Sequence, residues 1–438
     1  MSQAATTAGF STEAFRSFLE SRDEPAWLRE ARETAWQRFE SLPMPSQRDE
    51  EWMRTDIRLF RLDRFQLDSP SEPPTADAAL PAGLLTAGVD LAGQATTFKG
   101  RMRSAQLDPS LQARGVLYGS LDELATEHAD LVKQHLFSAV DPASDKFAAL
   151  HAACWSGGTI LYVPRGVRIE KPLHMLSTMA DGGVDCGHTL VILDEGAEAT
   201  LLAETASVGE GTGLHVGAIE LILGAGSRLR YVNLQNWSSG VWHFAHQKAL
   251  VGRDAQLQWT IAALGSRLAK VNQHVALTGE GAHCQVNGVM FTEGKQHLSY
   301  HTLQHHQAPH CKSDLLYKAA LQDASRTVWR GMIKVDKDAQ KTDGYQRNDN
   351  LILSDHARSD SIPGLEIQAD DVRCTHGSTA GRVDDEQVFY ARCRGLTRKE
   401  AIRMIVAGFF QQVFDRITID SVREALGQAI GRRIREYD

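Results

Sequence analysis

A short motif recurs along the second half of the chain, and it constrains the fold more than any other feature. Each copy has the end of an apolar run, a turn rich in acidic residues and glycine, and a small residue that begins the next run. The small residues are Ala197, Ser227, Ala255, Ala282, Ala324, Ala339 and Ala357. Such a repeat is typical of a solenoid, in which each coil buries its apolar face only against its neighbours.

The spacing of this motif and the residue alternation around it indicate strands. The small residues are 30, 28, 27, 42, 15 and 18 positions apart, and the step of 42 equals one long and one short step, 27 + 15. From about residue 155, apolar and polar residues alternate with a period of two, which is the strand pattern. We therefore expect a mainly β chain folded as a β-helix. A β-sandwich is the alternative, but its turns seldom keep one motif over so many copies.

Helical patterns flank this strand-rich region. Asp23-Glu24-Pro25 is a helix start, because proline favours the first helical position. An apolar stripe at helical spacing follows it, made of Leu28, Ala31, Ala35 and Phe39. Residues 66–95 are rich in Pro, Ala, Ser and Gly, as linkers are, and helices are expected between 121 and 137. The predicted organisation is a helical region over 1–65, a linker and mixed segment over 66–154, a β-helix core over 155–375 and a helical region over 376–438.

The C-terminal region carries an apolar stripe that is wider than one exposed helix needs. Thr397 and Glu400 form a capping box at its start. The stripe consists of Ile402, Ile405, Val406, Phe409, Phe410, Val413, Phe414 and Ile417, and a second helix has Val422, Leu426, Ile430 and Ile434 on one face. These helices either bury each other, which is the default, or offer part of the face to a partner.

Composition and charge exclude several classes of function. The net charge of −8, without a dominant basic stripe, argues against a general nucleic-acid binder. Residues 1–9 lack the basic and apolar segments of a signal peptide. No apolar run approaches the roughly 18 residues that span a bilayer. The expected location is therefore the cytoplasm.

The six cysteines do not suggest a self-sufficient metal site. The closest two are 19 residues apart (393 − 374), and there is no CxxC. A zinc ribbon, a ferredoxin-type cluster and a disulfide framework are all disfavoured by this spacing and by the absence of a secretion signal. Most of the six are expected to be buried; they are Cys154, Cys186, Cys284, Cys311, Cys374 and Cys393.

Cys374 and His376 form the first candidate site. They follow a run that is expected to be extended, and residues i and i+2 of a strand face the same side. Thiolate and imidazole are ligands that soft metals favour. Two ligands do not complete a site, so a metal here would need ligands from a neighbouring segment or a second chain. The alternative is a buried cysteine beside a hydrogen-bonded histidine.

A histidine-rich run is the second candidate. A helix would place His301 and His305 on one face, but Thr302, Gln307 and Pro309 favour a strand end and a loop. The alternatives are a metal site and hydrogen-bonded structural residues. The run comprises His301, His305, His306, His310 and Cys311.

Motifs of common enzymes are absent. There is no nucleophile elbow, phosphate-binding Gly-Lys loop or dinucleotide fingerprint. Asp370 and Asp371 are adjacent, and on a strand they would face opposite sides, which disfavours an acid–base pair. We expect a protein that is not an enzyme. Because β-helices host polysaccharide lyases and esterases, a carbohydrate-active enzyme stays an alternative.

One set of motifs resembles a known family. It runs from Ala339-Gln340-Lys341-Thr342-Asp343, through Cys374-Thr375-His376-Gly377 and Asp384-Asp385-Glu386-Gln387-Val388-Phe389-Tyr390, to Arg394-Gly395-Leu396. Arg48-Asp49-Glu50-Glu51-Trp52 also fits. This set resembles the SufB/SufD family of the SUF iron–sulfur cluster assembly system. The resemblance covers most of the chain and is densest from about 315 to 410.

The resemblance implies a fold, partners and site residues. The family's fold is a right-handed parallel β-helix flanked by helical regions. A SufD-type subunit pairs with a SufB-type subunit through the β-helix ends, and each binds a SufC-type ATPase through its C-terminal helices, here Ile402, Ile405, Val406, Phe409 and Phe410. A nascent iron–sulfur cluster forms transiently on the SufB side, and the SufD type is linked to iron supply. The family's histidine maps onto His376, with Cys374 as an assisting ligand, and acts with a SufB cysteine at the interface.

A departure from the pattern favours the SufD branch. The SufB type has a cysteine directly after Phe-Tyr, where this chain has Ala391, and Cys393 does not match that position. The SufB type's Cys-rich N-terminal motif is also absent. The resemblance therefore predicts a non-catalytic scaffold subunit. It leaves open whether iron enters through this chain, whether a flavin binds the complex, and whether the chain alone forms a homodimer. The remaining alternative is a stand-alone metal-binding β-helix that uses the histidines of residues 301–310.

Overall fold

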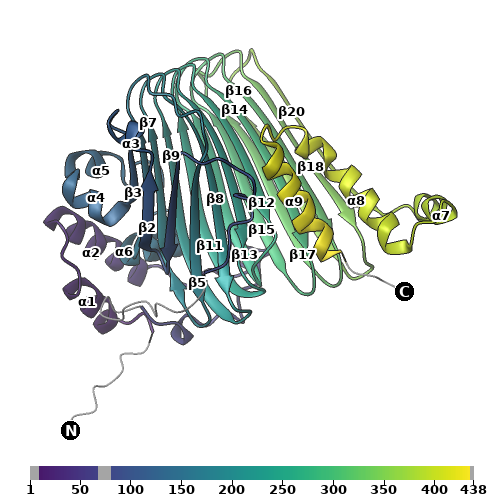
Figure 1. Ribbon diagram of the computed structural model, residues 1–438, viewed down its shortest axis with the longest axis horizontal. Helices are drawn as coiled ribbons and strands as arrows, with labels where there is room; N and C mark the ends of the chain where they lie inside the picture. Colours follow the sequence, from purple (N-terminus) through teal and green to yellow (C-terminus); the bar gives the residue numbers. More distant parts are fainter. Residues whose placement is uncertain (1–8, 68–79, 435–438) are drawn as a thin grey trace, which may run out of the picture.

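The computed structural model describes residues 9–67 and 80–434, and its central body is a long stack of strands (Figure 1). Residues 68–79, which belong to the predicted linker, lie outside the described residues. The strands form two sheets that face each other across a shared core. Each coil of the chain adds one strand to each sheet, which confirms the predicted parallel β-helix with helical flanks.

The two sheets are parallel throughout their central part, and only β1–β2 and β3–β4 pair antiparallel. Sheet A contains, in spatial order, β2 (Arg101–Leu107), β1 (Gly93–Phe98), β5 (Leu173–Ala180), β8 (Glu198–Val208), β10 (Arg228–Asn236), β12 (Gln256–Ala263), β14 (His283–Thr292), β16 (Lys312–Leu321), β18 (Asp343–Ile352) and β20 (Arg373–Arg382). Sheet B contains β19 (Arg358–Ile367), β17 (Arg326–Val335), β15 (His297–His306), β13 (Leu268–Leu277), β11 (Gly240–Val251), β9 (Thr212–Leu223), β7 (Gly187–Leu193), β4 (Gly157–Val163) and β3 (Leu117–Ser120), with β6 (Val184–Asp185) beside β9.

The turns between the sheets explain the uneven steps of the sequence motif. One edge of the solenoid, where the chain passes from sheet B to sheet A, holds Ala197, Ser227, Ala255, Ala282 and Ala339. Ala324 and Ala357 lie at the opposite edge, so the steps of 15 and 18 are half coils. Cys311 occupies the missing position at the first edge, and it splits the interval there into steps of 29 and 28 (311 − 282 and 339 − 311). In the coil of Ala324, the buried residue after the turn is Ser325 instead.

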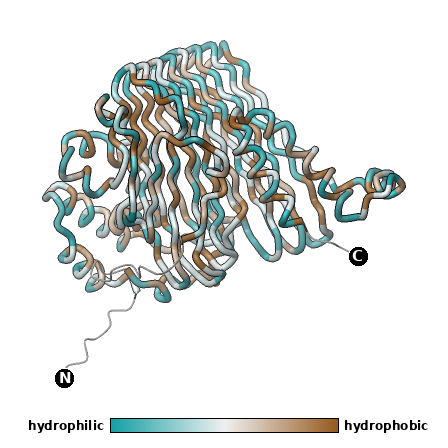
Figure 2. Tube along the Cα trace, in the orientation of Figure 1, coloured by the Kyte–Doolittle hydropathy of each residue, from teal (hydrophilic) through white to brown (hydrophobic). Residues whose placement is uncertain are grey.

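Strand alternation builds the core. Leu257, Trp259 and Ile261 of β12 are buried in the inner cluster that runs along the solenoid, whereas Ala262, the next residue, packs under the helices outside sheet A. Both faces of a central strand are therefore covered. Figure 2 shows apolar residues spaced along the strands and hydrophilic residues at many turns. Because each coil is stabilised mainly by the coils on either side, an end coil must be covered by something else.

The helices form two groups, one beside the N-terminal coils and one across the outer face of sheet A (Figure 1). The N-terminal group packs on the outer face of sheet B, where Phe147 stacks on Phe244 with ring centroids 3.9 Å apart. Pro25 precedes the second helix as predicted, but Arg32 rather than Ala31 is buried on its inner face. The N-terminal helices are α1 (Thr12–Glu20), α2 (Ala26–Ser41), the 3-10 turns η1 (Glu50–Trp52) and η2 (Leu62–Arg64), α3 (Pro109–Gln112), α4 (Leu121–Glu127), α5 (Ala129–His135) and α6 (Lys146–Cys154).

The C-terminal helices pack on the outer face of sheet A and make a joint cluster with it. The backbone carbonyls of Phe409 and Arg416 accept hydrogen bonds from Lys318 and Gln258 of the sheet, at 2.9 and 2.6 Å. The helices are α7 (Asp385–Cys393), α8 (Arg398–Phe414) and α9 (Asp420–Arg433). The boundary expected between 375 and 376 falls inside β20, which continues to Arg382. None of the helices in the described part of the chain is long and apolar enough to cross a membrane.

Candidate functional site at the open end of the solenoid

The two ends of the solenoid are finished differently. At the N-terminal end, β2 and β3 pair antiparallel with the first coils, and helices α3 to α5 follow there. At the C-terminal end, no described strand pairs with the outer edge of β19 or of β20. Each of these strands is ten residues long, and an uncovered edge of that length presents unpaired backbone N–H and C=O groups that can pair with another chain. The C-terminal end is therefore open.

Inner side chains of the last coil are exposed because no further coil covers them. Leu365 and Ile367 of β19 lie in register with Ile333 and Val335 of β17. The β17 residues are fully buried, whereas Leu365 and Ile367 are 38% and 40% exposed. Natural solenoids need a polar cap where a coil ends, and apolar residues at this position indicate a surface that a partner covers.

Cys374 and His376 lie on the inner face of this open end. Both belong to β20, two residues apart, so the predicted common face is correct. His376 is in register with Gln346 of β18, whose amide donates across the interior to Gly331 and Gly364 of sheet B. The His376 side chain is exposed, and Cys374 is partly buried. The last coil thus presents an imidazole and a thiol toward whatever covers its end.

The surroundings of Cys374 keep its sulfur in the thiol form in the isolated chain. It packs on the small apolar cluster of Ile333, Val335, Ala339 and Ala369. Burial raises the pKa of the Cys374 thiol above its ordinary value. A thiolate, which is the form that binds metal, would need a cation or a metal nearby. Gly344 makes room for the sulfur, since a Cβ there would lie 3.2 Å from Cys374 Sγ.

The two residues do not complete a metal site by themselves. Within residues 9–67 and 80–434, no group of three or more His, Cys, Asp or Glu side chains is placed to hold a metal ion. Zinc and iron–sulfur sites in proteins take about four protein ligands or keep one position open. A metal bound at these two residues would therefore need further ligands from elsewhere.

The histidines of residues 301–310 do not converge. His301 and His305 face outward from β15 and bind carboxylates, with Glu51 at 2.6 Å and Asp336 at 2.9 Å. His306 lies on the opposite face, where its Nε2 is 2.8 Å from Ser313 Oγ. His310 is in a turn with a positive φ of 60°. The reading of these residues as hydrogen-bonded and structural accounts for the geometry.

Most of the apolar stripe in α8 is buried within this chain. Ile402, Val406 and Phe410 are 6%, 0% and 0% exposed beneath sheet A and α9. Ile405 and Phe409 are only partly buried. Mutual burial, the default expectation, is therefore what most of the stripe does. The apolar residues that remain exposed in this region are different ones: Phe389, Tyr390 and Met404, at 69%, 60% and 54%.

These exposed residues lie on a part of the molecule that projects from the body. Helix α7 extends beyond the end of the solenoid (Figure 1). Sequence reasoning missed Phe389 and Tyr390 as surface residues because α7 has only two buried positions, Val388 and Ala391. A helix this short with a narrow buried face leaves its large side chains outside.

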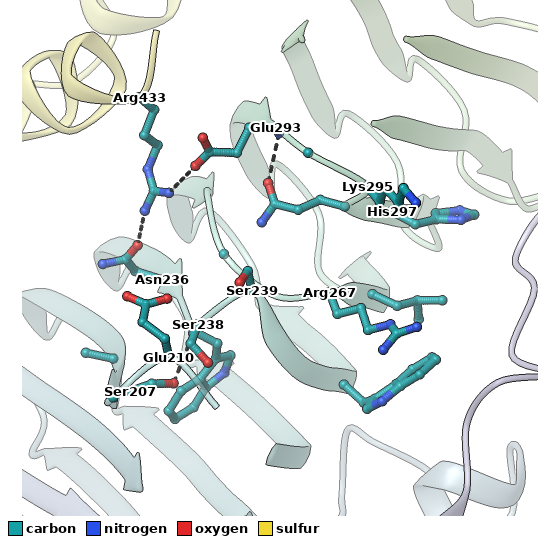
Figure 3. A pocket seen from close by; sticks show the side chains of 18 of the residues that line it. Ser207, Glu210, Asn236, Ser238, Ser239, Arg267, Glu293, Lys295, His297 and Arg433 are labelled. Atoms are coloured by element: carbon teal, nitrogen blue, oxygen red, sulfur yellow. Dashed lines mark hydrogen bonds and ion pairs between the residues drawn. The ribbon is translucent and has the colours of Figure 1, made fainter. Parts of the chain in front are cut away.

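A groove of about 910 Å³ follows the turns where sheet A passes to sheet B. Figure 3 shows Arg433, near the end of α9, at one side of this groove. Arg433 donates to Glu293 at 3.0 Å and to Asn236 at 2.6 Å. The hydrogen bond to Glu293 joins two charged groups and is therefore stronger than a neutral hydrogen bond. It ties the C-terminal helices to two separate coils, so a force on these helices would reach the solenoid.

Comparison with known proteins decides the family. Residues 175–409 match the family described as SUF system FeS cluster assembly, SufBD core domain, and residues 92–175 match the SufBD protein N-terminal region. The chain belongs to the SufBD family. The core match spans the strands from β5 onward, the open end, α7 and most of α8.

Relatives in the SufBD family align over most of their length. An iron–sulfur cluster assembly SufBD family protein of Mycobacterium leprae is 35% identical over 296 residues, 66% of this chain and 74% of that protein. One of Staphylococcus saprophyticus is 28% identical over 413 residues, 92% of this chain and 88% of the relative. The iron–sulfur cluster assembly protein SufB of Bacillus subtilis is 27% identical over 413 residues, which are 92% of this chain and 88% of that protein. The SufBD resemblance inferred from the motifs is thereby confirmed.

Proposed function

We propose that this chain is a SufD-type, non-catalytic scaffold subunit of a cytoplasmic SUF complex, in which it pairs with a SufB-type subunit through the open end of the solenoid. The open end carries this proposal: among the described residues, it leaves the outer edges of two ten-residue strands unpaired and inner residues of the last coil exposed. A second β-helix stacked there would continue both sheets by strand addition. It would also cover Leu365 and Ile367, which are 38% and 40% exposed in the single chain.

The SufD assignment is supported by the residue after Phe389-Tyr390. Ala391 stands where the SufB type has its cysteine, and it is 2% exposed against the rest of the C-terminal helices. Cys393, two residues further on, is exposed on α7 and lies 19 residues from Cys374 in the sequence (393 − 374). A chain with this pattern would rely on its partner for the thiolate that receives the cluster.

In this proposal the nascent cluster and its iron are cargo at the subunit interface. His376 offers a nitrogen lone pair from the inner face of β20, and Cys374 adds a thiol two residues away. Imidazole nitrogen binds iron, and metal binding favours the deprotonated cysteine. With the partner's ligands added, these groups would complete a site that neither chain holds alone.

Substitution of His376 tests the assembly role. We expect His376→Ala, co-expressed with the SufB-type and SufC-type subunits, to purify as an intact complex that has lost at least 80% of its iron and acid-labile sulfide. Cys374→Ser should lower both contents less, because it removes the assisting ligand only. His356→Ala, an exposed histidine on a turn between sheet A and sheet B, is the matched control. An intact His376→Ala complex with normal iron and sulfide would contradict the role of His376.

The SufC-type ATPase is proposed to dock on the C-terminal helices. The accessible apolar residues of α7 and α8 are the exposed Phe389, Tyr390 and Met404 and, from the stripe itself, the partly buried Ile405 and Phe409. Large exposed aromatic residues are the usual centre of a protein interface. Because α8 and α9 are bonded to sheet A, movement of the ATPase would be transmitted toward the open end.

Substitution of Phe389 tests this docking surface. We expect Phe389→Asp to weaken co-purification of the SufC-type ATPase at least tenfold while the thermal unfolding of the chain stays unchanged, since the side chain is 69% exposed. Phe410→Asp is not a clean probe, because Phe410 is fully buried and a carboxylate there would unfold the helices. Leu59→Asp, 72% exposed on the N-terminal region, is the matched control. Unchanged ATPase binding by Phe389→Asp would exclude α7 from the interface.

A further inference from the structure

A second groove, of about 570 Å³, lies on the outer face of sheet B. Its floor is formed by strands β11, β13, β15 and β17. One wall is Glu51 and Trp52 of η1, and the other is the segment 139–145 between α5 and α6. The volume is in the range of sites for small organic ligands, which are concave and largely apolar with a few polar groups.

The strand register divides the floor into a basic half and an apolar half. Lys248, His274, Leu303 and Met332 are successive partners across four parallel strands. They form a row of about 14 Å, three strand spacings of roughly 4.8 Å. Ala139 and Val140 of the wall lie at the Lys248 end, because their backbone N–H groups donate to Glu220 of β9, the register partner of Lys248. A cation thus stands at one end of an apolar strip.

The other charged groups of the groove already have partners. His301 and Arg330 both bind Glu51, at 2.6 Å each, and the hydrogen bond from His301 is the main reason why the pKa of Glu51 is lowered to about 2. His246 binds Asp145 at 2.8 Å, and Lys334 binds Glu366 at 2.8 Å. In each pair, the basic side chain already has an acidic partner. Asp141, at the rim, is exposed and accepts from the backbone of Ala143.

Lys248 is the one lysine or arginine among the described residues lining the groove that does not take part in these ion pairs. Among residues 9–67 and 80–434, no carboxylate forms an ion pair with Lys248, although its side chain is half-buried. Its neighbour His274 is neutral, because burial, together with the charge of Lys248 and with His305, lowers the pKa of His274 to about 3. His274 Nε2 has no hydrogen-bond partner among the described residues. The carboxylate of Glu220, its register partner on β9, is already held by three backbone N–H groups and His188 and forms no ion pair with Lys248. A half-buried ammonium without an ion-pair partner favours an anion beside it.

We propose that this groove binds a small organic anion, with a phosphate or carboxylate group at Lys248 and a flat apolar body along Leu303 and Met332. The apolar strip accounts for the body, and Lys248, which forms no ion pair with the described residues, accounts for the charge. A cationic ligand would find Glu51, Asp145 and Glu366 already engaged. The groove lies on the outer face of sheet B and reaches the last coil only at Glu366 of β19. Leu365 and Ile367 face the interior instead, so ligand binding can be tested separately from the proposed scaffold role.

Calorimetric titration of the full chain with 1-naphthyl phosphate tests the site. We expect saturable binding of one equivalent, and at least tenfold weaker binding of inorganic phosphate, which lacks the body, and of 1-naphthol, which lacks the anion. Comparison with 1-naphthoate identifies the preferred anionic group, since the two ligands share the body. Absence of saturable binding by both naphthyl anions, or equal binding of 1-naphthol, would overturn the proposal.

Variants of Lys248 locate the binding. Lys248→Met should weaken both naphthyl anions at least tenfold, and Lys248→Arg should keep the affinity within threefold because it keeps the charge. Lys295→Met is the matched control, since Lys295 is an exposed lysine that lines the other groove, and it should leave binding unchanged. Circular dichroism of each variant checks the fold. Equal affinities of the Lys248→Met and Lys295→Met chains would overturn the assignment.

Discussion

Replacement of Leu365 by aspartate is expected to prevent pairing with a SufB-type subunit. Leu365 points inward from β19 at the open end and is 38% exposed in the single chain. In a stacked pair of solenoids it would be covered by the partner's first coil, and a carboxylate there would be buried without a counter-charge. We expect the affinity to fall at least 100-fold, which corresponds to about 3 kcal/mol.

Analytical ultracentrifugation of the two purified subunits would measure this loss. The Leu365→Asp chain should sediment as a separate species at concentrations where the unmodified pair stays associated. Leu59→Asp introduces the same carboxylate at a leucine that is 72% exposed on the N-terminal region, and it should pair normally. The variant's own unfolding should change little, because no described strand pairs beyond the last coil and Leu365 is already 38% exposed. If the Leu365→Asp chain pairs as tightly as the Leu59→Asp chain, the open end is not the interface.

Replacement of Glu220 by alanine is expected to destabilise this chain strongly. Glu220 is fully buried on the outer face of β9. Its carboxylate accepts from the backbone N–H groups of Phe137, Ala139 and Val140 at 2.6, 2.7 and 2.8 Å. It also lies 3.1 Å from His188 Nε2. One side chain therefore fixes the segment between α5 and α6 on the solenoid.

The histidines behind Glu220 increase the cost of losing it. His151 Nδ1 lies 2.7 Å from the carbonyl of Val216, which can only accept, so this nitrogen carries a proton. Burial keeps the pKa of His151 well below its ordinary value, so the ring is neutral and its Nε2 accepts from His188 Nδ1 at 3.0 Å. One further proton, between His188 Nε2 and Glu220, completes this series of hydrogen bonds. Without the carboxylate, that proton and three buried N–H groups lose their acceptor.

Urea unfolding followed by circular dichroism would measure the effect. We expect Glu220→Ala to lose about 3–5 kcal/mol, the usual cost of leaving a buried charged group unpaired. Glu220→Gln should lose less, because it keeps one carbonyl oxygen for the N–H groups. The control is Glu198→Ala, whose carboxylate is 29% exposed beside Arg228 and should contribute under about 1 kcal/mol.

Hydrogen exchange gives a local check of the same prediction. The amides of Phe137, Ala139 and Val140 donate to Glu220 in the native chain, so peptides that cover residues 136–141 should exchange much faster in Glu220→Ala. Exchange in β12, β14 and β16 should be unchanged, since these strands belong to sheet A and the segment is bonded to Glu220 on the outer face of sheet B. A Glu220→Ala chain with normal exchange at 136–141 and a normal urea midpoint would show that Glu220 does not hold this segment.

The order of strands, turns and helices along the chain could be predicted from the sequence because it depends on local rules. Alternation with a period of two places Cys374 and His376 on one face of a strand whatever the rest of the fold does. The turn motif recurs because every coil needs a tight reversal and a small residue at its corner. The helix over Ala26–Ser41 begins after Pro25 for a similarly local reason. These features depend on residues that are close in the sequence.

The features that the sequence could not settle depend on which surfaces meet. The width of the stripe in α8 is the same whether sheet A or a partner covers it, and only the packing shows that Phe410 is buried while Phe389 is exposed. The same motif occurs at both edges of the solenoid. The motif alone therefore does not show that Ala324 and Ala357 lie at the opposite edge from the other small residues.

The sequence by itself determined the repeat, the family and the shared face of Cys374 and His376, because each of these depends on residues a few positions apart. The tertiary structure decided that this face lies at an uncovered end of the stack. It also decided that the histidines of residues 301–310 are held by Glu51, Asp336 and Ser313. Glu51 is 250 residues from His301, and no local rule predicts such a contact. Long-range burial, which leaves no period in the sequence, is the physical reason for the difference.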